Sequence, residues 1–115
     1  MLTTRSSGEG LDCEKGYVLI KGGILDITTT GEKGHCIKSS DYTTVDSDGK
    51  ITVTVYGNAS KGFKPGGDMT VVRGNMTILT NGDAYYDKDD ADISSAAGIK
   101  CDGNLLIENG EITIV

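Results

Sequence analysis

The chain has no tryptophan, one phenylalanine and one proline among its 115 residues. It also lacks any apolar run near the roughly 18–20 residues that a membrane-spanning helix needs. The scarcity of proline, without a three-residue glycine period, excludes collagen. Three cysteines, Cys13, Cys36 and Cys101, form no Cys-x-x-Cys pair, which argues against a disulfide framework and a zinc site. We expect three small buried thiols instead. A length of 115 residues excludes a multidomain protein, so we expect one domain.

The chain has fewer basic than acidic residues: 11 Lys and Arg and 17 Asp and Glu give a formal net charge of −6. An anionic chain is a poor partner for nucleic acids and anionic membranes, so we expect neither as the main ligand. Residues 1–7 lack the apolar core of a signal peptide. The protein is therefore expected to be intracellular, or to have lost a leader, or to be an excerpt of a longer chain.

Glycine and threonine are abundant, with 17 and 13 residues. Most threonines lie beside Ile, Val, Leu or Met, which is typical of β-strands. Short apolar clusters recur regularly, which argues against a disordered chain. No window has the i, i+3, i+4, i+7 spacing of an amphipathic helix, so we predict an all-β fold.

The sequence contains four repeats. Each opens with Gly or Cys, then a large apolar residue, then a charged one: Gly10-Leu11-Asp12, Cys36-Ile37-Lys38, Gly62-Phe63-Lys64 and Gly98-Ile99-Lys100. After Phe63 and Ile99, four apolar residues and a glycine follow at the same offsets of 6, 8, 11, 13 and 15. In the first repeat the corresponding residues follow Leu11 at offsets that are one residue longer. The second repeat matches this pattern less closely. We delimit the repeats as 8–32, 33–59, 60–83 and 94–115, with an insertion at 84–93.

Each repeat predicts three short strands separated by glycine or polar turns. Such a small unit cannot bury its own apolar face, but stacked copies can. We therefore predict a right-handed, single-stranded parallel β-helix (a solenoid) of about four rungs, about 4.8 Å apart. The predicted inward columns are Leu11/Ile37/Phe63/Ile99, Leu25/Ile51/Met76/Ile112 and Ile27/Val53/Ile78/Ile114. Recurring glycines predict corners of positive φ or tight bends, at Gly23, Gly49, Gly74 and Gly110.

Both ends of the sequence resemble strands. Leu2-Thr3-Thr4 is similar to the strand end Ile27-Thr28-Thr29, and the chain stops on the strand-like residues 111–115. Open rung ends favour pairing with further strands. We therefore expect an excerpt of a longer solenoid, or a coil that associates end to end with another copy.

The insertion has the highest density of potential metal ligands. Five carboxylates lie within ten residues: Asp83, Asp87, Asp89, Asp90 and Asp92. Ca²⁺ takes about 6–8 oxygen ligands, and mutually repelling carboxylates need a cation to stay ordered. The spacing does not match an EF-hand. Calcium binding and an ordinary solvated acidic loop both fit this pattern.

Two other groups suggest contacts with sugars. Tyr85 and Tyr86 adjoin the acidic segment, and exposed aromatic rings pack on sugar C–H faces, although tyrosines also cover a core. The outward position of each first strand holds, in order, Asp12, Lys38, Lys64 and Lys100. Stacked lysines would form a cationic ladder for uronate carboxylates, or a solvated row that discourages edge pairing.

A second outward column consists of Asp26, Thr52, Thr77 and Thr113. Flat threonine arrays can order water, which makes ice binding an alternative, while strand propensity on a wet face also explains this column. His35 has no partner that the sequence places, so we expect a turn residue. No residue stands out as a catalytic base.

Three motifs stand out: Gly98-Ile99-Lys100-Cys101-Asp102-Gly103, Gly22-Gly23-Ile24-Leu25-Asp26-Ile27-Thr28 and Ala59-Ser60-Lys61-Gly62-Phe63-Lys64. They resemble motifs of the carbohydrate-binding-domain family of parallel β-helix proteins from anaerobic, plant-fibre-degrading bacteria. The stretch from Tyr85 to Gly98, which includes most of the insertion, is the most family-like. The resemblance covers residues 8–115.

This resemblance implies a secreted or cell-surface β-helix that binds plant polysaccharide (cellulose, xylan or acidic pectin-type glycans) without cleaving it, with bound calcium. Attachment to a larger secreted enzyme would fit such a module. The fold also resembles that of pectate lyases. The alternative is therefore a lyase that cleaves uronate-containing glycans by calcium-assisted β-elimination, and a structural surface β-helix is a further alternative.

Overall fold

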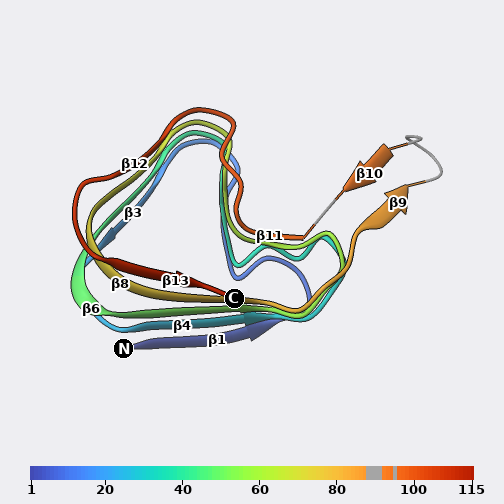
Figure 1. Ribbon diagram of the computed structural model, residues 1–115, viewed down its shortest axis with the longest axis horizontal. Helices are drawn as coiled ribbons and strands as arrows, with labels where there is room; N and C mark the ends of the chain where they lie inside the picture. Colours follow the sequence, from blue (N-terminus) through green and yellow to red (C-terminus); the bar gives the residue numbers. More distant parts are fainter. Residues whose placement is uncertain (88–91, 95) are drawn as a thin grey trace.

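The computed structural model describes residues 1–87, 92–94 and 96–115 (Figure 1). In this part of the chain all regular secondary structure is β-strand, as predicted, and no helix could span a membrane. The strands are β1 (Leu2–Ser6), β2 (Leu11–Cys13), β3 (Val18–Lys21), β4 (Leu25–Thr29), β5 (Ile37–Ser39), β6 (Thr43–Val55), β7 (Lys61–Pro65), β8 (Met69–Thr80), β9 (Tyr85–Asp87), β10 (Asp92–Ser94), β11 (Ala97–Ile99), β12 (Leu105–Ile107) and β13 (Glu111–Ile114).

Most strands belong to a coil of parallel strands, in which the successive turns lie one over another (Figure 1). One sheet contains β2, β5, β7 and β11 in adjacent positions. The larger sheet has the order β1-β4-β6-β8-β12, with β3 pairing with β6 and β13 pairing with β8. The chain thus forms a β-solenoid of about three turns, which confirms the predicted all-β, parallel architecture, although about four rungs were predicted.

The strand register confirms the predicted inward columns. Leu11 pairs with Ile37, Ile37 with Phe63, and Phe63 with Ile99. The larger sheet pairs the other two columns as predicted, Leu25/Ile51/Met76/Ile112 and Ile27/Val53/Ile78/Ile114. Because side chains alternate across a strand, each column faces the core, and every member except the exposed Ile114 belongs to the core or packs against it.

The two middle repeats differ from the predicted pattern of three short strands. There the second and third strands merge, so that β6 and β8 run for 13 and 12 residues. Gly49 and Gly74 consequently lie inside strands, and neither has a positive φ angle. Gly23 and Gly110 do have positive φ angles, of 82° and 124°, as expected of corners. The middle turns of the coil therefore bend without ending the strand.

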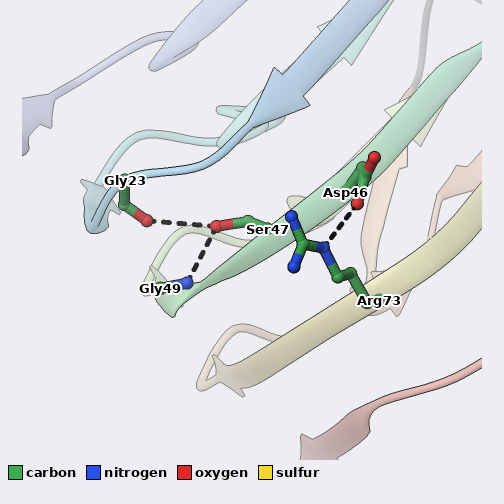
Figure 2. Close-up of polar contacts among 5 residues, drawn as sticks. All are labelled: Gly23, Asp46, Ser47, Gly49 and Arg73. Carbon is green, nitrogen blue, oxygen red and sulfur yellow. Dashed lines mark hydrogen bonds and ion pairs between the residues drawn. The ribbon is translucent and has the colours of Figure 1, made fainter.

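The bend in β6 coincides with register shifts on both sides of Asp46. Buried Ser47 joins two turns at this point: its hydroxyl donates to the Gly23 carbonyl at 3.2 Å and accepts from the Gly49 N–H at 3.0 Å (Figure 2). On the outer surface, Arg73 Nε of β8 forms an ion pair of 2.7 Å with Asp46 Oδ1 (Figure 2). Ser47 thus satisfies two backbone groups beside the irregular register, the Gly23 carbonyl and the Gly49 N–H, while the ion pair joins side chains of neighbouring turns.

The hydrophobic core is the stack of inward side chains. Phe63, Ile51 and Val71 are completely buried in the middle turns. Burial of one such side chain stabilises the fold by about 1.5–3 kcal/mol. In the last turn, Ile107 and Ile114 remain 48% and 52% exposed, because no further strand layer of the described residues covers them. The middle turns therefore hold the best-packed part of the core.

One corner of the coil requires glycine in successive turns. A Cβ atom at Gly57 would collide with the carbonyl oxygen of Gly31, and one at Gly82 would collide with that of Gly57. The turns approach each other here without a side chain between them, which is possible only for glycine.

The three cysteines are free thiols. Cys36 is buried, with Sγ 3.5 Å from Thr29 Oγ1, and burial raises the pKa of its thiol. Cys13 and Cys101 are partly exposed, so the prediction of a buried thiol is confirmed for Cys36 and is only partly met by the other two.

The insertion forms an antiparallel hairpin of β9 and β10. Figure 1 shows this hairpin projecting from the corner before β11, on the outward side of the sheet that contains β11.

Candidate functional site

The three lysines predicted as a ladder lie on successive turns of the coil. Lys38 of β5 and Lys64 of β7 are register partners. Lys100 directly follows Ile99, which pairs with Phe63, so it continues the same outward column. We call Lys38, Lys64 and Lys100 the lysine column. Asp12 of β2, the register partner of Lys38, occupies the fourth position.

The lysine column is a region of concentrated positive charge. Burial is the main cause that lowers the pKa of Lys64, and the neighbouring ammonium groups of Lys38 and Lys100 lower it further. Asp102 and Glu9 partly offset this effect. Asp102 also forms an exposed ion pair of 3.5 Å with Lys100. The neighbouring positive charges repel each other, and a bound anion would relieve this repulsion.

Sequence reasoning missed two residues at the edge of this column. Lys61 is buried at the start of β7, and its Nζ donates to the Ala59 carbonyl at 3.0 Å. His35 lies in the connection between β4 and β5, as expected of a turn residue, but it is buried, and its Nδ1 accepts the Lys61 backbone N–H at 3.0 Å. Burial, followed by the charges of Lys64, Lys61 and other lysines, lowers the pKa of His35 to about 4. His35 is therefore neutral at pH 7.

The predicted calcium ligands are only partly described by the structure. Asp83 is exposed just before β9, and its backbone N–H donates to Asn58 Oδ1 at 2.9 Å. Asp87 and Asp92 are register partners across the hairpin. Asp89 and Asp90 lie outside the described residues. Among the residues that the structure does describe, no group of three or more His, Cys, Asp or Glu forms a metal site.

The tyrosines divide into two groups. Tyr85 and Tyr86, predicted as a sugar platform, belong to the backbone of β9, and their side chains lie outside what the structure describes. Tyr17 and Tyr42, from the first two turns, stack in parallel, with ring centroids 4.6 Å apart and an interplanar angle of 6°. They remain 53% and 39% exposed. The clearest aromatic surface among the described side chains is thus at a different corner from the predicted one.

The sequence did contain a signal for this pair. Tyr17 directly precedes Val18 and Tyr42 directly precedes Thr43, and these two residues are register partners in β3 and β6. The one-residue offset of the first repeat hides this correspondence when positions are counted from Leu11. Only after the register is known do the two tyrosines fall in one column.

Comparison with models of known protein families gives a match over the whole chain, residues 1–115, to the family described as "Carbohydrate-binding domain-containing protein". Searches of curated proteins and of solved structures found no match. The parallel solenoid and its stacked outward side chains agree with the expectation drawn from the sequence motifs. The chain belongs to the carbohydrate-binding domain-containing protein family.

Proposed function

We propose that this protein binds acidic plant polysaccharides without cleaving them, and that the lysine column contacts their uronate carboxylates. Family membership supports carbohydrate as the ligand. The register of Lys38 and Lys64, continued by Lys100, is the observation that favours an acidic chain over cellulose or xylan. Such glycans lie outside cells, so a secreted or cell-surface location belongs to the same proposal.

The spacing of the lysines suits an extended polymer. Adjacent parallel strands lie about 4.8 Å apart, so the column offers positive charges at short, regular intervals along the coil axis. A polyanion lying along this axis, across the strands, would meet one ammonium group per turn. Charge-assisted hydrogen bonds to carboxylates are stronger than neutral ones, and the rigid backbone ladder holds the lysine Cα atoms in place before binding.

We further propose that calcium assists binding through the aspartate-rich segment that contains Asp83, Asp87, Asp89, Asp90 and Asp92. Asp87 and Asp92 are paired across the hairpin, and like charges in such positions destabilise a strand pair. Carboxylate oxygens are the ligands that calcium prefers, so a bound ion would offset this repulsion. Tyr85 and Tyr86, in the same hairpin, would then contribute aromatic rings for sugar contact.

One observation favours lyase activity as a second candidate. In β-elimination, a base takes the proton from the carbon next to the carboxylate, and the C–O bond on the neighbouring carbon breaks. A C=C bond forms between these two carbons, and the leaving oxygen takes up a proton. The lowered pKa of Lys64 makes its neutral amine more available as that base. Incubation with polygalacturonate tests this directly, because unsaturated products absorb in the ultraviolet.

Affinity gel electrophoresis in polygalacturonate tests the binding proposal. Replacing Lys38 and Lys64 by Gln should weaken binding by about tenfold or more, which corresponds to about 1.4 kcal/mol. Lys21→Gln/Lys50→Gln, at exposed positions of β3 and β6 in the other sheet, is the charge-matched control and should bind like the unaltered protein. Added salt should weaken binding, because exposed charges are screened. Equal losses in both variants, or no retardation of the unaltered protein, would contradict the proposal.

A further inference from the structure

We infer that the stacked pair Tyr17 and Tyr42 belongs to a second sugar-contact surface, which takes uncharged pyranose rings. This inference deepens the proposed function, since it assumes a carbohydrate ligand, but it concerns other residues and another class of glycan. We call this surface the tyrosine face, and its members are Tyr17, Leu19, Tyr42, Thr44, Asp68 and Thr70.

The backbone register brings these residues together. Leu19 of β3, Thr44 of β6 and Thr70 of β8 are neighbours across the larger sheet. The residues that precede these strands are neighbours too, because Val18 N–H donates to the Tyr42 carbonyl at 3.0 Å and Thr43 N–H donates to the Asp68 carbonyl at 3.0 Å. Two aromatic rings, an exposed leucine, hydroxyl groups and a carboxylate therefore lie along one corner and the adjoining sheet surface.

The two loops that carry the tyrosines are held rigidly. Gly16 N–H donates to Ser40 Oγ at 2.8 Å, and Asp41 N–H donates to the Gly16 carbonyl at 2.9 Å. In the next turn, Asp68 Oδ1 accepts the Asn104 N–H at 2.8 Å. Side chains on an ordered backbone lose little conformational freedom when a ligand binds, so an exposed but fixed aromatic pair favours binding.

The chemistry of the tyrosine face favours neutral sugars. Tyr17 and Leu19 are 53% and 49% exposed, and this apolar surface matches the C–H faces of pyranose rings. Tyrosine and threonine hydroxyls and the Asp68 carboxylate are hydrogen-bonding partners for sugar hydroxyls. The members carry no positive charge, and Asp68 would repel a uronate carboxylate. The lysine column and the tyrosine face thus differ in the charge of the ligand that each prefers.

Affinity gels with hydroxyethyl cellulose, a soluble neutral glucan, and with polygalacturonate separate the two surfaces. The unaltered protein should be retarded by both polymers. The Tyr17→Ala/Tyr42→Ala variant should lose about tenfold or more in affinity for the neutral polymer and keep its affinity for polygalacturonate. Tyr56→Ala removes another exposed tyrosine, 49% exposed, which directly follows the far end of β6, and should keep both. Tyr17→Phe/Tyr42→Phe should retain most neutral binding, because the aromatic rings remain and only the hydroxyl groups are lost.

The outcomes distinguish this inference from the proposed function. No retardation of the unaltered protein by the neutral polymer overturns the inference while leaving uronate binding intact. Retained neutral binding by the alanine variant, or an equal loss with Tyr56→Ala, also overturns it. If replacement of Lys38 and Lys64 by Gln weakens binding to polygalacturonate but not to the neutral polymer, the result supports two separate surfaces. Circular dichroism of each variant verifies that the β-solenoid is folded.

Discussion

The imidazole Nδ1 of His35 accepts the backbone N–H of Lys61 at 3.0 Å, within a region that also holds several lysines. This bond requires the neutral imidazole. A protonated ring would lose the acceptor and would add a positive charge beside Lys61, Lys64 and Lys38. The buried histidine therefore couples folding to pH.

Stability should fall as the pH is lowered from about 6.5 to about 4. The folded pKa of His35, about 4, lies below its unfolded value of about 6.5, so the unfolded chain binds the proton first. The stabilisation is complete above the unfolded pKa and is lost as the pH falls towards the folded pKa, by at most about 3 kcal/mol. Urea unfolding at several pH values measures this loss. His35→Gln should have a flatter profile in this window, and an unchanged profile would contradict the prediction.

Polyanion binding should depend on the protonation of Lys64. Its folded pKa lies below the ordinary lysine value, so the free protein loses this charge at a lower pH than an ordinary lysine would. A bound uronate favours the charged form and raises this pKa, so affinity should decrease as the pH rises through the pKa of the free protein. NMR titration of the Lys64 side chain, with and without oligogalacturonate, measures both values. Lys64→Arg should keep its affinity to higher pH, because arginine stays charged.

Calcium should raise the melting temperature, and EDTA should reverse the effect, if the aspartate-rich segment binds the ion. Asp87→Asn/Asp92→Asn should abolish this response. Glu111→Gln, a change of one exposed acid in β13, should preserve it. Identical melting curves with calcium and with EDTA would contradict the calcium proposal, whatever the result for polysaccharide binding.

Gly57→Ala should destabilise the coil by about 1–3 kcal/mol or more, because the new methyl group would collide with the Gly31 carbonyl oxygen and force neighbouring turns apart. Gly8→Ala is the matched control, since a Cβ at Gly8 meets no atom within 4 Å. It should change stability by no more than about 0.5 kcal/mol. Chemical denaturation measures both changes in the free energy of unfolding. Equal stability of the two variants would contradict the prediction, because neighbouring turns could then move apart at this corner without cost.

Phe63→Ala should cost about 3–5 kcal/mol, because Phe63 is fully buried between Ile37 and Ile99 in the first inward column. Val72→Ala, at an exposed position of β8, should have a small effect. Thermal unfolding followed by circular dichroism compares them. A small loss with Phe63→Ala would mean that neighbouring turns close the cavity.

Much of the fold was predictable because stacking repeats the same environment. Leu11, Ile37, Phe63 and Ile99 share one position in each repeat, and a solenoid places such positions in one column. The lysine column followed from the same rule. The continuous strands β6 and β8 did not, because Gly49 and Gly74 suggest turns in sequence, whereas neither has a positive φ angle and strand pairing resumes directly after each glycine.

By itself, the sequence determined the strand content, the parallel coil and the inward columns, since period-two apolar residues in small repeats have no other way to be buried. Apart from the lysine column, the tertiary structure alone decided which outward side chains meet. Tyr17 follows Leu11 by six residues, whereas Tyr42 follows Ile37 by five. The two rings stack because the strand register nevertheless pairs the residues that follow them, Val18 and Thr43. The environment of His35 depends on Lys61, which follows 26 residues later in the next turn. Contacts of this kind are set by the spacing of whole turns, and no local pattern encodes them.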